Sequence, residues 1–149
     1  MNTATAQLQA TLKQYGYSLT AARTTVFTML DGKEPQAMAE LVASCSPAIN
    51  RASVYRVTAL FEQLGIVQRL PIGWKYKLEL SGAFHSHHHH ITCTRCAKTV
   101  SIGEDSHLET HVAEAAQTAG FRMSGHQLEI QGLCSDCIKN DPNEKHPGQ

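Results

Sequence analysis

The first half of the chain repeats apolar positions with a helical period in four short stretches. Neighbouring apolar residues stand three or four positions apart, which places them on one face of a helix. Thr20 and Asn50 precede two of the stretches and can accept hydrogen bonds from first-turn N–H groups. The predicted inward positions are Leu8, Leu12 and Tyr15; Ala22, Val26, Met29 and Leu30; Met38, Leu41 and Val42; and Val54, Val57, Phe61 and Leu64.

Signals that end helices follow each of these stretches. They are Gly16, Asp31-Gly32, Ser46-Pro47 and Gly65. Residues 66–70 and 74–80 are rich in strand-forming side chains and predict a hairpin joined by Pro71-Ile72-Gly73. Helices followed by a β-hairpin are the order of a winged helix, a relative of the helix-turn-helix.

The fourth predicted helix carries polar side chains that suit contact with DNA. They lie in its first two turns and are Arg51, Ser53, Tyr55 and Arg56. A recognition helix reads bases with its N-terminal residues, and arginine can donate two hydrogen bonds to guanine. A solvated helix face has a similar composition because exposed arginine is common. The pattern by itself therefore leaves both interpretations open.

The second half of the chain concentrates histidine and cysteine. Four consecutive histidines, residues 87–90, precede a Cys-x-x-Cys pair, and a second pair follows near the C-terminus. Imidazole and thiolate are the donors that borderline-soft metals prefer, and two such cysteine pairs predict one tetrahedral structural zinc. Its ligands are Cys93, Cys96, Cys134 and Cys137. A purification tag or a redox pair are weaker interpretations, because the histidines are internal and the cysteine pair is duplicated.

Charge divides the chain near Ser81-Gly82. Residues 1–82 carry eight Lys/Arg and five Asp/Glu, a net +3, whereas residues 83–149 carry five and eight, a net −3. We therefore expect an α+β protein with a winged-helix domain at 1–82, a metal-binding domain at 83–140 and a flexible tail at 141–149. The total charge of zero does not itself favour nucleic-acid binding.

Hydropathy and cysteine use favour a cytoplasmic protein. No apolar stretch approaches the ~20 residues of a membrane span, and the N-terminus lacks the regions of a signal peptide. The cysteines then serve as thiols and ligands rather than disulfides, and Cys45 as a small buried apolar side chain. A helix in the second half is expected to pack through Leu108, Val112, Ala115 and Ala119, with His107 and His111 exposed.

Several motifs in order resemble the ferric uptake regulator family over about residues 8–138. They are Gly16-Tyr-Ser-Leu-Thr-Ala-Ala-Arg23, Ala52-Ser-Val-Tyr-Arg-Val57, Leu64-Gly-Ile-Val67, His85-Ser-His-His-His-His-Ile-Thr-Cys93 with Cys96, and His126-Gln-Leu-Glu-Ile-Gln-Gly-Leu-Cys134. Members of that family are dimeric, metal-responsive DNA-binding regulators, mostly repressors. They join a winged helix to a C-terminal α/β dimerisation domain.

The resemblance implies three metal sites. The four cysteines match the structural zinc site. A second site matches His87, His89, Glu109 and His126, and a regulatory site at the hinge between domains matches Glu79, His88 and His90. Alternation in a strand would send the two histidine pairs to opposite faces. The DNA-binding residues implied are Arg23, Arg51, Ser53, Tyr55 and Arg56.

The hinge site departs from the family pattern. A histidine often stands just before the third helix, where this chain has Glu34-Pro35-Gln36-Ala37. His85 or Glu34 could complete the set. Ser101 stands where the peroxide-sensing branch has a carboxylate, which argues against that branch. Nitrogen and oxygen donors suit Fe²⁺ or Zn²⁺, and Mn²⁺ is also compatible.

We therefore predict a metal-dependent transcriptional regulator, a repressor of metal-homeostasis genes, rather than an enzyme. It binds a double-stranded DNA operator as a homodimer and holds structural Zn²⁺ and a regulatory divalent metal. We expect no association with a membrane. One alternative is a zinc metallohydrolase that uses the histidine cluster with Glu104 or Glu109 as base. The other alternative is a metal storage protein. Both would leave the winged-helix half without a role.

Overall fold

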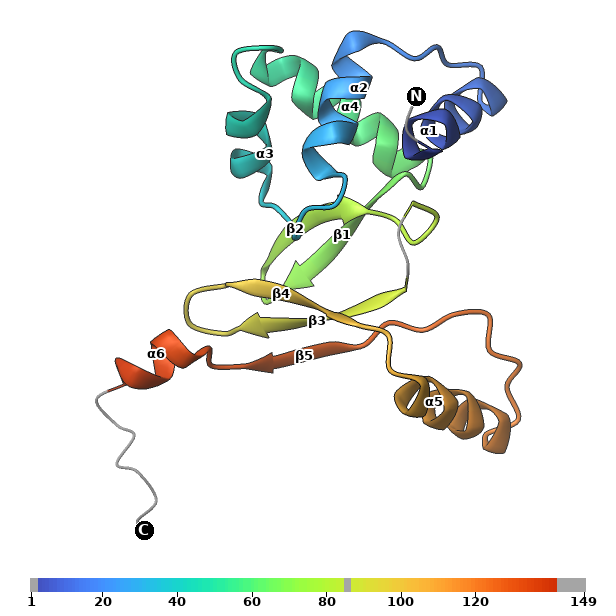
Figure 1. Cartoon of the computed structure of the whole chain (residues 1–149), viewed down its shortest axis with the longest axis vertical. Coiled ribbons are helices and arrows are strands. Elements are labelled where there is room, and N and C mark those ends of the chain that lie inside the picture. Colours follow the sequence, from blue (N-terminus) through green and yellow to red (C-terminus); the bar gives the residue numbers. More distant parts are fainter. Residues whose placement is uncertain (1–2, 85–86, 142–149) are drawn as a thin grey trace. The chain divides into compact units, whose positions relative to one another are not determined.

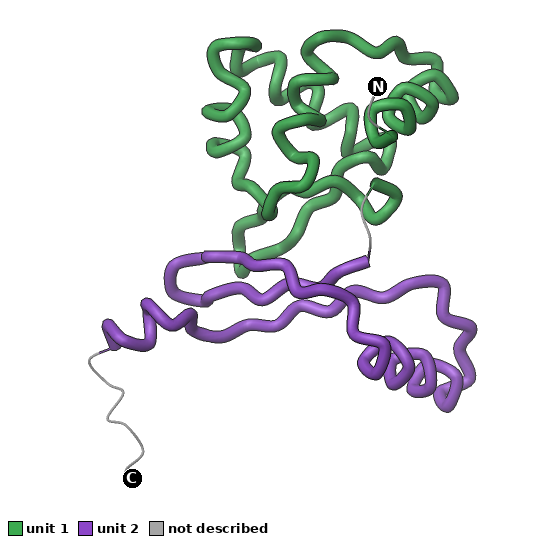
Figure 2. Tube along the Cα trace, in the orientation of Figure 1, with its two compact units in different colours: residues 1–86 green, residues 87–149 purple. Residues whose placement is uncertain are grey.

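The computed structural model describes residues 3–84 and 87–141 and divides into two compact units, residues 1–86 (unit 1) and 87–149 (unit 2) (Figure 2). Phe84 packs its ring edge-on against Phe27 with the centroids 5.3 Å apart. Unit 1 therefore extends past the boundary that the charge pattern indicated. Within the described ranges, no helix has both the length and the apolar character that crossing a bilayer requires.

Unit 1 begins with four helices, as the periodicity predicts (Figure 1). They are α1 (Thr3–Gln14), α2 (Ala21–Leu30), α3 (Met38–Cys45) and α4 (Arg51–Gln63). Both predicted caps are present: Thr20 Oγ1 accepts from the Arg23 N–H at 3.3 Å, and Asn50 Oδ1 accepts from the Ser53 N–H at 2.9 Å. These bonds satisfy N–H groups that the first helical turn leaves without a partner.

The core of unit 1 is formed by buried apolar side chains from all four helices and the hairpin. Its buried members are Leu8, Leu12, Val26, Phe27, Leu30, Leu41, Cys45, Val54, Val57, Phe61, Ile66, Val67, Leu78 and Leu80. Cys45 is 1% exposed and packs as a small apolar residue, as predicted. The prediction for Tyr15 was wrong: α1 ends at Gln14, so the helical period no longer applies, and the ring is 55% exposed.

The hairpin of unit 1 is shifted relative to its prediction. β1 (Val67–Ile72) pairs antiparallel with β2 (Lys75–Leu80), so Pro71 and Ile72 belong to a strand rather than to the turn. Proline is tolerated there because a two-stranded sheet leaves one edge of each strand unpaired. The turn contracts to two residues, and Gly73 takes the positive φ of 60° that glycine adopts without a Cβ clash.

Unit 2 is built around a three-stranded sheet in the order β4-β3-β5. The strands are β3 (His88–Cys93), β4 (Thr99–Gly103) and β5 (Glu129–Gly132), and the helices are α5 (Ser106–Thr118) and α6 (Ser135–Lys139). β3 runs antiparallel to β4 and parallel to β5. Figure 1 shows α5 and α6 at opposite ends of this sheet, so β3 leads from one helix toward the other.

Helix α5 forms where the apolar period predicts it, but it buries none of its residues. Asp105 caps it by accepting from the N–H groups of His107 and Leu108. Leu108 is only half-buried and Ala115 is exposed, so the expectation of a packed apolar face was wrong for the single chain. The physical reason is that an apolar helix face is buried only when another element covers it. His107 is exposed, as predicted, and so is the next histidine of the helix, His111.

Candidate metal centres and nucleic-acid interface

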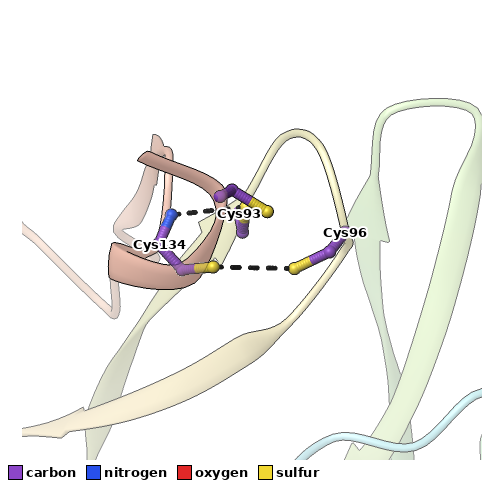
Figure 3. A group of neighbouring side chains, drawn as sticks. Cys93, Cys96 and Cys134 are labelled. Carbon is purple, nitrogen blue, oxygen red and sulfur yellow. Dashed lines mark hydrogen bonds between the residues drawn. The ribbon is translucent and has the colours of Figure 1, made fainter. Parts of the chain in front are cut away.

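The structure brings the four predicted zinc-binding cysteines together. The Sγ atoms of Cys93, Cys96, Cys134 and Cys137 all lie within 4.8 Å of one another. Parallel pairing of β3 with β5 aligns Cys93 with Gly132, which carries the second pair to the first despite the long intervening segment. Figure 3 shows Cys96 Sγ facing Cys134 Sγ, 3.8 Å away. Four converging thiols are the donor set of a tetrahedral zinc site.

Backbone N–H groups favour the thiolate that zinc requires. The N–H of Cys96, together with that of Cys134 at 3.4 Å from Cys93 Sγ, lowers the pKa of Cys93 to about 6 (Figure 3). Burial, reinforced by bonds to its neighbouring cysteines, raises the pKa of Cys137 to about 12. Four thiolates repel one another, so some of the cysteines keep their protons until a bound cation replaces those protons. The donor chemistry therefore fits Zn²⁺.

A second cluster forms where β3 begins, around the carboxylate of Glu109. Its oxygens lie 3.3 Å from His87 Nε2, 2.8 Å from His89 Nε2 and 3.2 Å from His126 Nε2. Glu109 stands in the first turn of α5, and His126 lies three residues before β5. His89 is 1% exposed, so its ring is held by the surrounding structure. Three imidazoles and a carboxylate form a nitrogen and oxygen donor set.

The charge of Glu109 is stabilised by this histidine cluster. Desolvation alone raises the pKa of Glu109, but its hydrogen bond with His89 and the charges of His126 and His87 lower it by more. The carboxylate therefore stays ionised, which is the form that binds a metal.

The alternation predicted along the histidine run is confirmed. The rings of His87 and His89 lie 4.7 Å apart, and those of His88 and His90 lie 4.8 Å apart. On the second face, His90 Nδ1 lies 3.3 Å from a carboxylate oxygen of Glu129 on β5. Metal-binding histidines often bond to a carboxylate through the ring nitrogen that does not bind the metal.

The predicted hinge ligands are divided between the units. Glu79 stands on β2 of unit 1, whereas His88 and His90 stand on β3 of unit 2. His85, the further candidate, lies outside the described residues, as do all but the first residue of the predicted flexible tail. The hinge site thus stays a prediction.

The candidate DNA-binding side chains lie in unit 1 at the start of α4. Arg51 Nη2 donates to the Tyr55 hydroxyl at 3.3 Å, and Arg56 Nη2 donates to Ser53 Oγ at 3.2 Å. Arg23 of α2 lines a pocket that Ser53 and Arg56 also line. Guanidinium and hydroxyl groups side by side suit phosphate and base contacts.

Three residues with a place at these sites were missed from the sequence. Tyr17 stacks beneath the Arg23 guanidinium, with 5.3 Å from Cζ to the ring centroid. Glu129 contacts a predicted ligand, and Arg95, between two of the cysteines, bonds to residues near the C-terminus. Arg95 stands inside a cysteine pair and Tyr17 stands six residues before Arg23, so both gave a local signal. The contact of Glu129 with His90 depends on how distant segments fold.

Known proteins resemble this chain along most of its length. The model of the ferric uptake regulator family matches residues 14–131. The ferric uptake regulation protein of Bacillus subtilis (strain 168) is 32% identical over 139 residues, covering 88% of this chain and 92% of that protein. The crystal structure of the Vibrio cholerae ferric uptake regulator has a TM-score of 0.70 and 26% identity, covering 85% of this chain and 98% of that chain.

A further solved structure supports the fold alone. The Helicobacter pylori ferric uptake regulator, described as having three functional metal binding sites, has a TM-score of 0.75 at 21% identity. It covers 90% of this chain and 91% of that chain. The α+β class predicted from the sequence is confirmed by these similarities.

Proposed function

The chain belongs to the ferric uptake regulator family of metal-responsive transcriptional regulators, and we propose that metal bound in unit 2 sets the geometry in which a homodimer presents two α4 helices to operator DNA. The observation that carries this proposal is that β3 supplies donors to two ligand clusters at its opposite ends. Proteins of this family are transcriptional regulators and not enzymes, and the relatives support neither the metallohydrolase nor the storage alternative.

The two clusters of unit 2 would divide the work of metal binding. We assign Zn²⁺ to the four cysteines, because thiolates bind it tightly and with little exchange. The cluster around Glu109 would hold a second divalent cation. Its mixed donors suit Fe²⁺, Zn²⁺ and Mn²⁺, so they allow a metal that exchanges with its supply in the cell.

The homodimer would form through the exposed apolar side of the unit 2 sheet. Ile91 of β3 stands opposite Val100 of β4 and Ile130 of β5, and each of the three is about two-fifths exposed. A row of apolar side chains across three strands favours association with a second copy, because burial removes it from water. The apolar face of α5 would gain the cover that one chain does not provide.

DNA recognition would fall to α4 and α2, and control of it to the hinge. Arg51, Ser53, Tyr55 and Arg56 would meet base edges and phosphates, with Arg23 beside them. Glu79, His88 and His90, joined by His85 or Glu34, would bind the regulatory metal. A metal that binds one arrangement of the two domains more tightly shifts the population toward it. Half-site spacing then decides whether both recognition helices fit the operator.

Repression is the mode that most of this family uses, and we propose it for this chain. A regulator acts where the chromosome lies, so we place it in the cytoplasm.

Operator binding and metal content, measured together, test this proposal. The full chain is purified without oxygen, and its metals are determined before and after mild chelation. Duplexes selected from a random pool then report DNA affinity. We expect zinc to stay, DNA affinity to fall with the exchangeable metal, and Fe²⁺, Mn²⁺ or Zn²⁺ to restore it.

Two variants and two matched controls assign the residues. Arg56→Ala should weaken binding by about 1–3 kcal/mol without changing metal content, whereas Arg122→Ala, an exposed arginine of unit 2, should not. His88→Ala should abolish the metal response and retain zinc, whereas His111→Ala on α5 should preserve both. DNA binding that ignores metal, or that survives Arg56→Ala unchanged, would contradict the proposal.

A further inference from the structure

Helix α6, which carries Cys137, is not held in place by buried side chains of its own. β3 and β5 pair up to Cys93 and Gly132, and the Thr94 N–H donates to the Gly132 carbonyl at 2.8 Å. Beyond this point the chain enters α6, whose five residues include none that is buried. Apolar packing therefore does not fix Cys137 against the first cysteine pair.

Arg95 reaches from the first cysteine pair to the end of α6. Its Nη1 donates to the Cys137 carbonyl at 2.8 Å, and its Nη2 donates to Asp141 Oδ2 at 2.6 Å. Arg95 stands between Cys93 and Cys96, so one guanidinium ties the turn of the first pair to the segment of the second. A planar guanidinium suits this because it donates in two fixed directions.

The end of α6 offers Arg95 a carbonyl that the helix itself cannot satisfy. The last four carbonyls of a helix have no intrahelical N–H partner. Asn140 donates to the Asp136 carbonyl, the Asp141 N–H donates to that of Ile138, and Arg95 donates to that of Cys137. A positive group is also favoured at the negative end of the helix dipole.

Charge gives Arg95 a second reason to lie there. Four thiolates around Zn²⁺ leave roughly two negative charges uncompensated. The guanidinium lies next to this site, and Asp141, 15% exposed, orients it. A positive charge beside the site offsets part of this negative charge.

We propose that Arg95 is a positioning residue of the structural zinc site: its hydrogen bonds to the Cys137 carbonyl and to Asp141 hold α6 beside the first cysteine pair and thereby slow the loss of zinc. These two hydrogen bonds are called the clasp below. This inference rests on the zinc site proposed above. Arg95 does not itself bind the metal: its two hydrogen bonds would keep Cys137 beside the other three cysteines, so that the four donors stay together.

Zinc release from the purified, zinc-loaded full chain tests the clasp. An excess of a chromogenic chelator is added, and the release rate is measured for wild type, Arg95→Ala, Arg95→Lys and Asp141→Asn. We expect Arg95→Ala to release zinc about 10–100-fold faster, the range seen when support for a metal ligand is removed. Arg95→Lys should restore slow zinc release only in part, because an ammonium group does not donate in the two fixed directions of a guanidinium. Asp141→Asn, which keeps the bond to Cys137, should show a smaller increase.

Substitution with Co²⁺ gives a readout that a purely structural role would not change. The absorption bands of tetrahedral cobalt thiolate should weaken in Arg95→Ala, because Cys137 is no longer held as a fourth ligand. Arg122→Ala is the matched control for loss of one positive charge in unit 2, and it should keep both the wild-type rate and the bands.

The outcomes separate the clasp from the zinc site. Two results overturn the clasp alone. One is zinc release from Arg95→Ala at the wild-type rate, and the other is release from Arg122→Ala as fast as that from Arg95→Ala. If Arg95→Ala does not form a folded dimer, Asp141→Asn decides: a wild-type rate there overturns the clasp. Wild-type protein that contains no zinc overturns the zinc site and this inference together.

Discussion

Unit 1 and unit 2 bury different kinds of side chain. In unit 1 the interior consists of large apolar side chains such as Phe27 and Phe61. In unit 2 the buried positions are mainly polar or metal-binding, among them His89, His90 and Cys93, while apolar residues on the sheet stay exposed. Unit 1 can thus be stabilised by its own core, whereas we expect unit 2 to depend on a cation and on a partner.

From this difference we expect unit 2, rather than unit 1, to respond to metal. Burying one large apolar side chain contributes about 1.5–3 kcal/mol, whereas a structural zinc contributes an apparent ~10–16 kcal/mol in small domains. One ion can therefore replace several core residues. We therefore expect the stability of unit 2 to follow metal supply, and unit 1 to stay folded whether or not metal is bound.

The largest expected effect is on unit 2, from Cys93→Ser. Removing one thiolate should abolish tight zinc binding and cost most of the folded dimer, while the helices of unit 1 remain. Zinc content, light scattering and residue-resolved NMR measure the three consequences. Cys45→Ala, a change to the buried cysteine of unit 1, should keep zinc and cost about 1 kcal/mol of stability. A Cys93→Ser dimer that melts like wild type would refute the dependence of unit 2 on zinc.

The converse change is Phe61→Ala in unit 1. Loss of a fully buried ring should cost about 3–5 kcal/mol of unfolding free energy, enough to unfold unit 1 and abolish DNA binding. Zinc stoichiometry and the dimer should persist, because the cysteine cluster shares none of this core. Thermal melts followed separately by NMR signals of each unit check this. Simultaneous loss of zinc would show that the two units do not fold independently.

The smallest expected effect concerns Glu109 in chelated protein. Its pKa is lowered in the folded chain, because the His89 bond and nearby histidine charges outweigh desolvation. Its ionised form therefore adds stability above the ordinary carboxyl pKa, and that stability is lost as pH falls through the lower folded value. Melting temperatures of wild type should exceed those of Glu109→Gln slightly near pH 6, and the two should converge in acid. Glu114→Gln, more exposed on the same helix, should show no such difference.

Local patterns predicted unit 1 better than unit 2. Thr20 and Asn50 cap helices as expected because a cap depends on residues three positions away. Pro71 was misplaced because its tolerance depends on whether the strand lies at an edge. The apolar face of α5 was expected to be packed, yet periodicity states only which residues share a face and not what covers them. Arg95 and Glu129 were missed because their partners lie about forty positions away in the sequence.

By itself, the sequence determined the chemistry of this protein: thiolates in two pairs, alternating histidines, capped helices and the motif order of its family. These follow from side-chain type and spacing along one element, which the covalent chain already specifies. Only the tertiary structure decided which donors meet, because a four-cysteine site needs β3 and β5 in register and an imidazole cluster needs α5 turned toward β3. The described part of unit 2 buries mainly polar or metal-binding side chains, so we expect that unit to depend on metal and on a second copy of the chain.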